Sequence, residues 1–242
     1  MKHFWVILFF AAPLLADSRN QVFSDFTTPL PLAPSDTLII GVVGGWERWD
    51  AEHRIVRRIC LRLRERKLPG VYVETVENHK MNLAAELVNR AFDRNRDGSL
   101  DAEERQNARL ILYGQSLGGS AVVRFARELN AQQVPIQLTM QIDSVGKGDK
   151  VIPPNVKTAV NLFQRDTWPV VGEKNIVAED PSRTRILDNL QFRYWGKDVD
   201  LSEETWVRRI FTRGHTKMEF DPEVWQKTES YILEALRGMS GR

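Results

Sequence analysis

Apolar and polar residues along the chain form blocks of two kinds, continuous apolar runs and amphipathic segments. Residues Thr37 to Val43 are an almost unbroken apolar run, which is typical of a strand buried on both faces of a parallel sheet. From Ile55 on, apolar residues alternate with arginines at helical spacing, which predicts a helix with a basic, solvated outer face. The other predicted strands are 71–76, 109–113, 136–143, 156–163 and a weaker one near 185–195, and the other predicted helices are 81–92, one that contains 120–126, and one that begins at 221–223.

This alternation of strands and helices predicts an α/β fold with a parallel sheet and right-handed crossovers. No internal repeat or low-complexity linker divides the sequence, so we expect one domain over residues 37–242. Residues 19–36 contain Pro29, Pro31 and Pro34 and lack periodicity, which predicts an extended lead-in on the surface of that domain.

The first 18 residues have the pattern of a secretory signal peptide. A positively charged start precedes an apolar run from Phe4 to Leu15, and the small residues Ala16 and Ser18 follow it. We expect cleavage there and a secreted or periplasmic protein. The alternative is a retained membrane anchor, although the run is short for a bilayer. With one cysteine, Cys60, no internal disulfide can form, and we expect Cys60 to lie in the core.

Charge excludes one broad class of partner. The formal net charge is only +2, and no basic run is interleaved with aromatic residues. Nucleic-acid binding proteins carry a basic patch or stripe, so we expect no nucleic-acid partner. The sequence does not predict an oligomeric state.

A Gly-x-Ser-x-Gly pattern stands where the predicted strand 109–113 meets the next helix. Gly114 and Gly118 flank Ser116 at two positions on either side, where a strained turn requires small residues. The pattern resembles the nucleophile elbow of the α/β-hydrolase superfamily. The resemblance implies a three-layer α/β-hydrolase fold, with a mainly parallel central sheet of about six strands and helices on both faces. It also implies that Ser116 is the nucleophile.

The same resemblance implies an acid and a histidine that follow the serine in the chain. Of the four histidines, only His215 lies after the last predicted strand and before the terminal helix, where the superfamily places its base. Asp143 ends the strand after the elbow helix, an arrangement similar to that of pancreatic-type lipases. Asp166 follows the next strand, where most of the superfamily places the acid. We favour Asp143, and Asp166 is the alternative.

An oxyanion hole needs two backbone N–H groups that point at the developing negative charge. The resemblance implies that Leu117, directly after the nucleophile, supplies one of them. The loop after the first strand would supply the other, with Trp46 as the donor and Gly45 as the hinge that lets the backbone approach the substrate.

Residues 93–104 match the EF-hand calcium loop throughout. Gly98 stands at the sharp turn, and the oxygen donors of the pattern are Asp93, Asn95, Asp97, the carbonyl of Ser99, Asp101 through water, and both oxygens of Glu104. Calcium prefers such oxygen ligands. EF-hand sensors usually work as pairs of loops, whereas here no second loop follows and the next strand cuts the exiting helix short. We therefore expect one structural calcium ion, Ca2+.

Two functions remain open from the sequence. The first is a secreted serine hydrolase that cleaves carboxylic esters through an acyl-enzyme, with a small-molecule or lipid-like ester as substrate. The second is a calcium-binding protein on a hydrolase scaffold whose catalysis is lost or unused. The two differ in whether His215 and an aspartate converge on Ser116.

Overall fold

The core of the protein is a six-stranded sheet in which every neighbouring pair of strands is parallel. The structure is a computed structural model, and it describes residues 20–166, 170–206, 208 and 213–240. The strand order is β2-β1-β3-β4-β6-β8. The strands are β1 (Thr37–Val43), β2 (Val71–Glu77), β3 (Leu110–Gln115), β4 (Ile136–Ile142), β6 (Val156–Gln164) and β8 (Arg185–Phe192).

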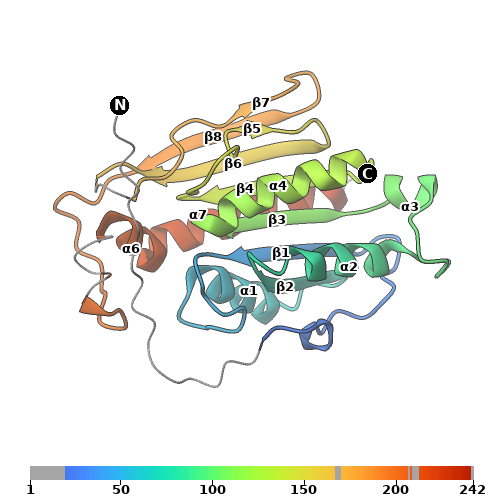
Figure 1. Ribbon diagram of the computed structural model, residues 1–242, viewed down its shortest axis with the longest axis horizontal. Helices are drawn as coiled ribbons and strands as arrows, with labels where there is room; N and C mark the ends of the chain where they lie inside the picture. The colour runs from blue at the N-terminus through green and yellow to red at the C-terminus, as the bar shows by residue number, and fades with distance from the viewer. Residues whose placement is uncertain (1–19, 167–169, 207, 209–212, 241–242) are drawn as a thin grey trace, which may run out of the picture.

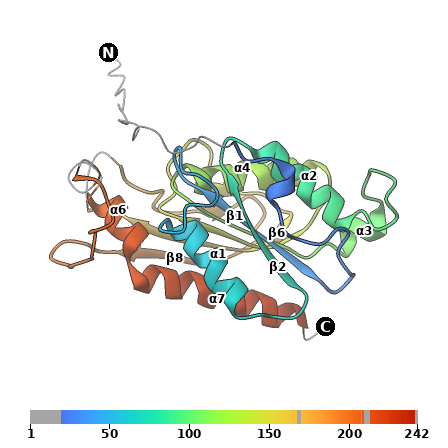
Figure 2. The ribbon, with the colours of Figure 1, turned by 90° about the horizontal axis from the view of Figure 1, so that it is seen from below.

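Helices cover both faces of this sheet and complete three layers (Figures 1 and 2). One face carries α2 and α4, and the other carries α1, α6 and α7. A short helix, α3, precedes β3 at the far end of the molecule. The helices are α1 (Ile55–Glu65), α2 (Met81–Phe92), α3 (Ala102–Gln106), α4 (Leu117–Ala131), α6 (Arg213–Phe220) and α7 (Pro222–Ser240).

Successive residues of a central strand point into two different cores. In β1, Ile40 packs with residues of α2 and α4, whereas Ile39 packs with residues of α1 and α7. Strand residues alternate between the faces of a sheet, so a strand covered on both faces needs apolar residues at every position. The unbroken apolar run of β1 follows from this, and all seven of its residues are buried.

The lead-in before β1 lies along β2, an edge strand of the sheet. Gln21 donates to the carbonyl of Thr75 at 2.8 Å, and the Glu74 carboxylate accepts hydrogen bonds from the amides and hydroxyls of Thr27 and Thr28. These contacts cover an edge that would otherwise expose unpaired backbone groups. The segment contains one 3-10 turn, Phe23–Asp25, and a second turn in which the amide of Asp36 donates to the carbonyl of Ala33 at 2.9 Å.

Two features of the structure away from the candidate site were not predicted from the sequence. Strands β5 (Val151–Ile152) and β7 (Val177–Ala178) form a separate two-stranded parallel sheet. The arginines of α1 form ion pairs, although we predicted a solvated face: Arg62 contacts Glu229 of α7, and Arg64 contacts Glu74 at 2.7 Å. The amphipathic pattern of α1 did not predict these ion pairs. Helix α7 packs against α1, and an amphipathic pattern does not identify which element faces the polar side of a helix.

The predicted signal peptide, residues 1–18, lies outside the described residues. Over the ranges that the structure does describe, none of the helices has the length and apolar character needed to cross a membrane.

Candidate active site

Ser116 lies at the carboxyl end of β3, in the turn that leads into α4. Its backbone has φ 55° and ψ −124°, a left-handed conformation that costs a residue with a side chain about 1–3 kcal/mol. Its amide donates to the carbonyl of Ile142 at the end of β4, at 3.0 Å. The strained turn is therefore tied to the neighbouring strand, and Ser116 stands at the N-terminal, positive end of a 15-residue helix.

Packing explains why the residues around Ser116 are small. A Cβ on Gly114 would lie 2.5 Å from the carbonyl oxygen of Gly118, and a Cβ on Gly118 would lie 2.1 Å from the carbonyl oxygen of Val42. Both distances are far shorter than van der Waals contact, and the atoms that would clash belong to buried backbone. The Gly-x-Ser-x-Gly pattern is thus a steric requirement of this strand-turn-helix unit.

His215 and Asp143 are in direct contact, although 72 residues separate them. His215 Nδ1 lies 2.6 Å from Asp143 Oδ2, and both side chains are buried. Asp143 directly follows β4 and has a positive φ of 44°. Gln164, the last residue of β6, donates from its backbone amide to Oδ1 at 3.0 Å and from its side chain to Oδ2 at 2.9 Å. The carboxylate is held from two directions.

The surroundings of His215 favour its protonated form. Burial by itself lowers the pKa of His215, but the hydrogen bond and negative charge of Asp143, together with the charge of Glu219, outweigh burial and raise the pKa above its ordinary value. A histidine with a raised pKa is a stronger base, and it loses that role when the pH falls below its pKa.

Asp166, the alternative acid, serves a different purpose. Its carboxylate accepts hydrogen bonds from the backbone amides of Tyr194 and Trp195. It therefore joins the loop after β6 to the loop after β8. Of the two aspartates, the structure places Asp143 beside His215.

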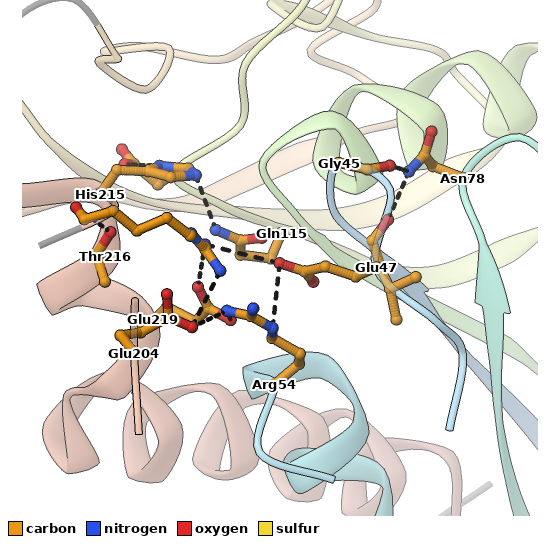
Figure 3. Close-up of polar contacts among 12 residues, drawn as sticks. Gly45, Glu47, Arg54, Asn78, Gln115, Glu204, His215, Thr216 and Glu219 are labelled. Carbon is orange, nitrogen blue, oxygen red and sulfur yellow. Dashed lines mark hydrogen bonds and ion pairs between the residues drawn. The ribbon is translucent and has the colours of Figure 1, made fainter. Parts of the chain in front are cut away.

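Gln115, which the sequence analysis missed, also contacts His215. Its side-chain nitrogen lies 3.0 Å from His215 Nε2 (Figure 3). Gln115 directly precedes Ser116, so this contact brings the end of β3 against α6. The only local signal is its position, because a polar residue that ends a buried strand next to a candidate nucleophile is well placed to touch the site.

The loop after β1 lies beside Ser116. A Cβ on Gly44 would lie 3.1 Å from the Cβ of Ser116. Gly45 has φ +46°, and its carbonyl accepts from Asn78 at 2.5 Å. Trp46 is 79% exposed, and its ring lies 5.7 Å from that of His79. Both Gly45 and Trp46 follow the end of β1, which pairs with β3.

Leu117 is the first residue of α4, and its amide therefore has no partner four residues earlier within the helix. Its side chain is 41% exposed. With Trp46 it gives this end of the sheet two exposed apolar side chains.

Five charged residues form a cluster next to His215, which we call the ion cluster: Glu47, Arg54, Glu204, Arg208 and Glu219. Figure 3 labels all of them except Arg208. Glu219 lies one turn after His215 on α6. It accepts from Arg54 at 3.2 Å and from Arg208 at 2.7 Å. Glu47, in the loop after β1, lies 3.7 Å from both arginines. The cluster thus connects that loop, α1 and α6.

The ion cluster contains more acid than base, and its carboxylates are largely removed from water. Burial raises the pKa of Glu47 well above its usual range, and the charge of Glu219 adds to this, while Arg54 acts in the opposite direction. Burial also raises the pKa of Glu219, again against the effect of Arg54. Both carboxyls therefore bind protons more tightly in the folded protein.

The predicted calcium loop lies at the opposite end of the sheet from Ser116, between α2 and α3 (Figure 1). Asp93 accepts from the amide of Gly98 at 2.9 Å, and Asp101 caps α3 through the amide of Glu104 at 2.9 Å. Glu104 turns back over the start of the loop and accepts from the amides of Arg94 and Asn95. Gly98 has φ +91°. The turns of the loop are therefore closed by its own carboxylates.

The fit of this loop to calcium is mixed. Its donors are oxygens, as calcium requires. Within the described part of the chain, however, no three side chains of His, Cys, Asp or Glu gather closely enough to hold a metal ion. Asp97 accepts hydrogen bonds from the amide and hydroxyl of Ser99, both at 2.9 Å, and one from Asn95. The calcium site remains a prediction.

The three layers, the sheet order and the turn at Ser116 define the α/β-hydrolase fold that the sequence predicts. No protein-family model and no curated protein matches the chain. Among solved structures, a promiscuous phosphotriesterase from metagenomic libraries, described as dienelactone hydrolase-like, is similar to it. The two are 10% identical, the match covers 88% of each chain, and the TM-score is 0.42.

Proposed function

We propose that this protein is a serine hydrolase that cleaves carboxylic esters, with Ser116 as nucleophile, His215 as base and Asp143 as the acid that orients the base. The observation that carries the proposal is the contact of 2.6 Å between His215 and Asp143. This contact lies at the carboxyl end of the sheet, where Ser116 occupies a strained turn. Gln115, the neighbour of Ser116, contacts the other nitrogen of the same imidazole.

In this proposal the hydroxyl proton of Ser116 moves to Nε2 of His215 while Oγ forms a bond to the ester carbonyl carbon. The carbonyl π electrons move to its oxygen, and the amides of Leu117 and Trp46 stabilise that charge. When the tetrahedral intermediate collapses, the bond to the alcohol breaks and the alkoxide takes the proton from Nε2. Water, activated by His215, then hydrolyses the acyl-enzyme and regenerates Ser116.

The exposed apolar side chains beside Ser116 favour an uncharged acyl group. Leu117 and Trp46 offer apolar surface, which gains free energy when a substrate covers it. We therefore propose a small-molecule or lipid-like ester as substrate.

In agreement with the charged start and apolar run of residues 1–18, we also propose that the protein is exported and cleaved there.

We further propose a structural role for calcium in the loop 93–104. The pattern of oxygen donors in the sequence supports it, with Asp93, Asn95, Asp97, Ser99, Asp101 and Glu104 as the residues that would hold the ion. When bound, calcium would neutralise the carboxylates and stabilise the connection between α2 and β3. It takes no part in the proposed reaction.

The alternative, a calcium-binding protein with lost catalysis, differs in the reactivity of Ser116. A fluorophosphonate probe tests this without knowledge of the substrate, because it reacts only with an activated serine. We expect the exported protein to be labelled, and we expect Ser116→Ala to abolish both the labelling and the hydrolysis of p-nitrophenyl butyrate. Ser120→Ala is a matched control. Failure of the native protein to be labelled between pH 6 and 9 would refute the proposed activity.

A further inference from the structure

Gln115 faces the nitrogen of His215 that the proposed reaction needs. The amide nitrogen of Gln115 lies 3.0 Å from Nε2, while Nδ1 faces Asp143 on the other side of the ring. An amide NH₂ group can only donate a hydrogen bond. Nε2 therefore accepts, its lone pair is free of a proton, and the proton of the neutral ring lies on Nδ1, where Asp143 accepts it.

The side chain of Gln115 is held against His215 by its packing. Gln115 is 1% exposed, and its carbonyl oxygen Oε1 is buried without a hydrogen-bond partner among the described residues. A Cβ on Gly44 would lie 2.4 Å from that oxygen. The amide is therefore enclosed between the loop after β1 and His215, and only a glycine at position 44 leaves room for it.

A row of hydrogen bonds with one direction follows from these contacts. Gln115 donates to His215, His215 donates to Asp143, and Gln164 donates to Asp143 from the far side. A donor at each end of the row fixes which atoms carry protons in the middle. The arrangement stabilises one tautomer of the imidazole against the other. The NH₂ of Gln115 also opposes the imidazolium, whose Nε2–H would point at it, whereas Asp143 favours the imidazolium.

We propose that Gln115 is a positioning residue that holds His215 in the neutral Nδ1–H tautomer, with Nε2 ready to take the proton of Ser116. In the resting enzyme the amide of Gln115 occupies Nε2, and the hydroxyl of Ser116 replaces it when the reaction begins. The role in the reaction rests on the proposed ester hydrolysis, whereas the tautomer is a property of the folded protein.

Other charged groups also act on His215, and a test must separate Gln115 from them. Asp143 lies at Nδ1, and Glu219 lies on the same helix. The groups that face Glu219 in turn are Arg54, Arg208, Glu47, Glu204, His53 and Arg58. Gln115 carries no charge, so its replacement by methionine removes one hydrogen bond and leaves every one of these charges in place.

The experiment is nitrogen NMR of the protein labelled with ¹⁵N-histidine, titrated from pH 5 to 9, with His215→Asn to assign the signals. In the native protein we expect the neutral ring of His215 to carry its proton on Nδ1. In Gln115→Met we expect the proton affinity of His215 to rise about two- to tenfold, the effect of one ordinary hydrogen bond lost from the neutral form. Gln141→Met is the control, because Gln141 is buried on the adjacent strand β4 and donates to the carbonyl of Asp149.

Esterase rates give the second measurement. For Gln115→Met the acidic limb of kcat/KM against pH should move to higher pH, by the same factor as the proton affinity that NMR measures. A purely structural defect would lower the rate at every pH. A proton on Nε2 in the neutral native ring, or an unchanged or lowered proton affinity in Gln115→Met, would overturn the role of Gln115. If Gln115→Met does not fold, the tautomer of the native protein decides. An inactive native enzyme would instead refute the ester hydrolysis and leave the NMR result standing.

Discussion

Replacing Asp143 by asparagine removes a charge and changes the direction of one hydrogen bond. The carboxylate accepts from His215 Nδ1, from the side chain of Gln164 and from the backbone amide of Gln164, and it is fully buried. Every neighbour of its two oxygens is thus a donor. An asparagine must place its NH₂ group against one of them, inside a fully buried site.

Two orientations of the new amide are available, and both are costly. With NH₂ at the position of Oδ1, it faces the backbone N–H of Gln164, and a buried donor stays unsatisfied at a cost of about 1–3 kcal/mol. With NH₂ at the position of Oδ2, it forces Nδ1 of His215 to accept, so that the ring proton moves to Nε2. A base protonated at Nε2 cannot take the proton of Ser116. In a serine protease this wrong tautomer lowers kcat by about 10⁴.

We therefore expect Asp143→Asn to lose about 1–3 kcal/mol of unfolding free energy, which lowers Tm by about 2–12 °C, and to lower kcat for p-nitrophenyl butyrate by about 10³–10⁴. Asp166→Asn is the matched control, because an asparagine oxygen can still accept from the amides of Tyr194 and Trp195. Its rate should stay within a fewfold of the native enzyme. If both variants lose activity equally, or Asp166→Asn loses more, the assignment of the acid is wrong.

Three further predictions test the elbow, the ion cluster and the calcium loop. Gly118→Ala should destabilise the fold by about 1–3 kcal/mol, because its Cβ would lie 2.1 Å from the Val42 carbonyl. Gly238→Ala is the control: its Cβ meets nothing within 4 Å in α7, so it should stabilise the fold by up to about 1 kcal/mol. Urea unfolding measures both variants, and equal effects would contradict the steric account. Burial raises the pKa of Glu47, so the contribution of Glu47 to stability is complete below its unfolded-state pKa and is lost as the pH rises through its folded-state pKa. Glu47→Gln should therefore flatten the dependence of the unfolding free energy on pH between 5 and 9. An unchanged dependence would contradict a raised pKa of Glu47. If calcium fills the loop 93–104, EGTA should lower Tm, by the equivalent of about 2.7 kcal/mol when calcium had been at 100 times its Kd. Glu104→Gln should lower Tm in the same way with calcium present. A Tm that EGTA leaves unchanged would argue against the site.

The sequence predicts the sheet well because each strand carries its own evidence. The apolar run at 37–43 is almost unbroken, five of the eight residues at 156–163 are apolar, and the structure places strands β1 and β6 there. The terminal helix begins as predicted, with Pro222 as its first residue and Asp221 accepting from the amide of Glu223 at 3.0 Å. Such signals are local, and tertiary packing adds to them without changing them.

The ion cluster and Gln115 have no such local signal. Arg54 meets Glu219 across 165 residues, and Gln115 meets His215 across 100. The sequence predicted no helix at 213–220, because Arg213 to Phe220 is too polar to show an amphipathic pattern. Seven of its eight residues are buried nonetheless, since Glu219 finds arginines and His215 finds Asp143. A sequence pattern predicts such polar residues to be exposed, because the partners that allow their burial lie far away in the chain.

The three residues of the proposed triad are held in different ways, and this difference predicts how the protein tolerates change. Backbone hydrogen bonds between strands fix Ser116 and Asp143, since Ser116 donates to Ile142 and Asp143 donates to Leu162 at 2.7 Å. His215 is carried by a helix that the ion cluster joins to α1 and to the loop after β1. Substitutions at the strand ends should therefore act first on stability. Substitutions in the ion cluster should act first on the position and proton affinity of His215, and so on the pH dependence of the rate.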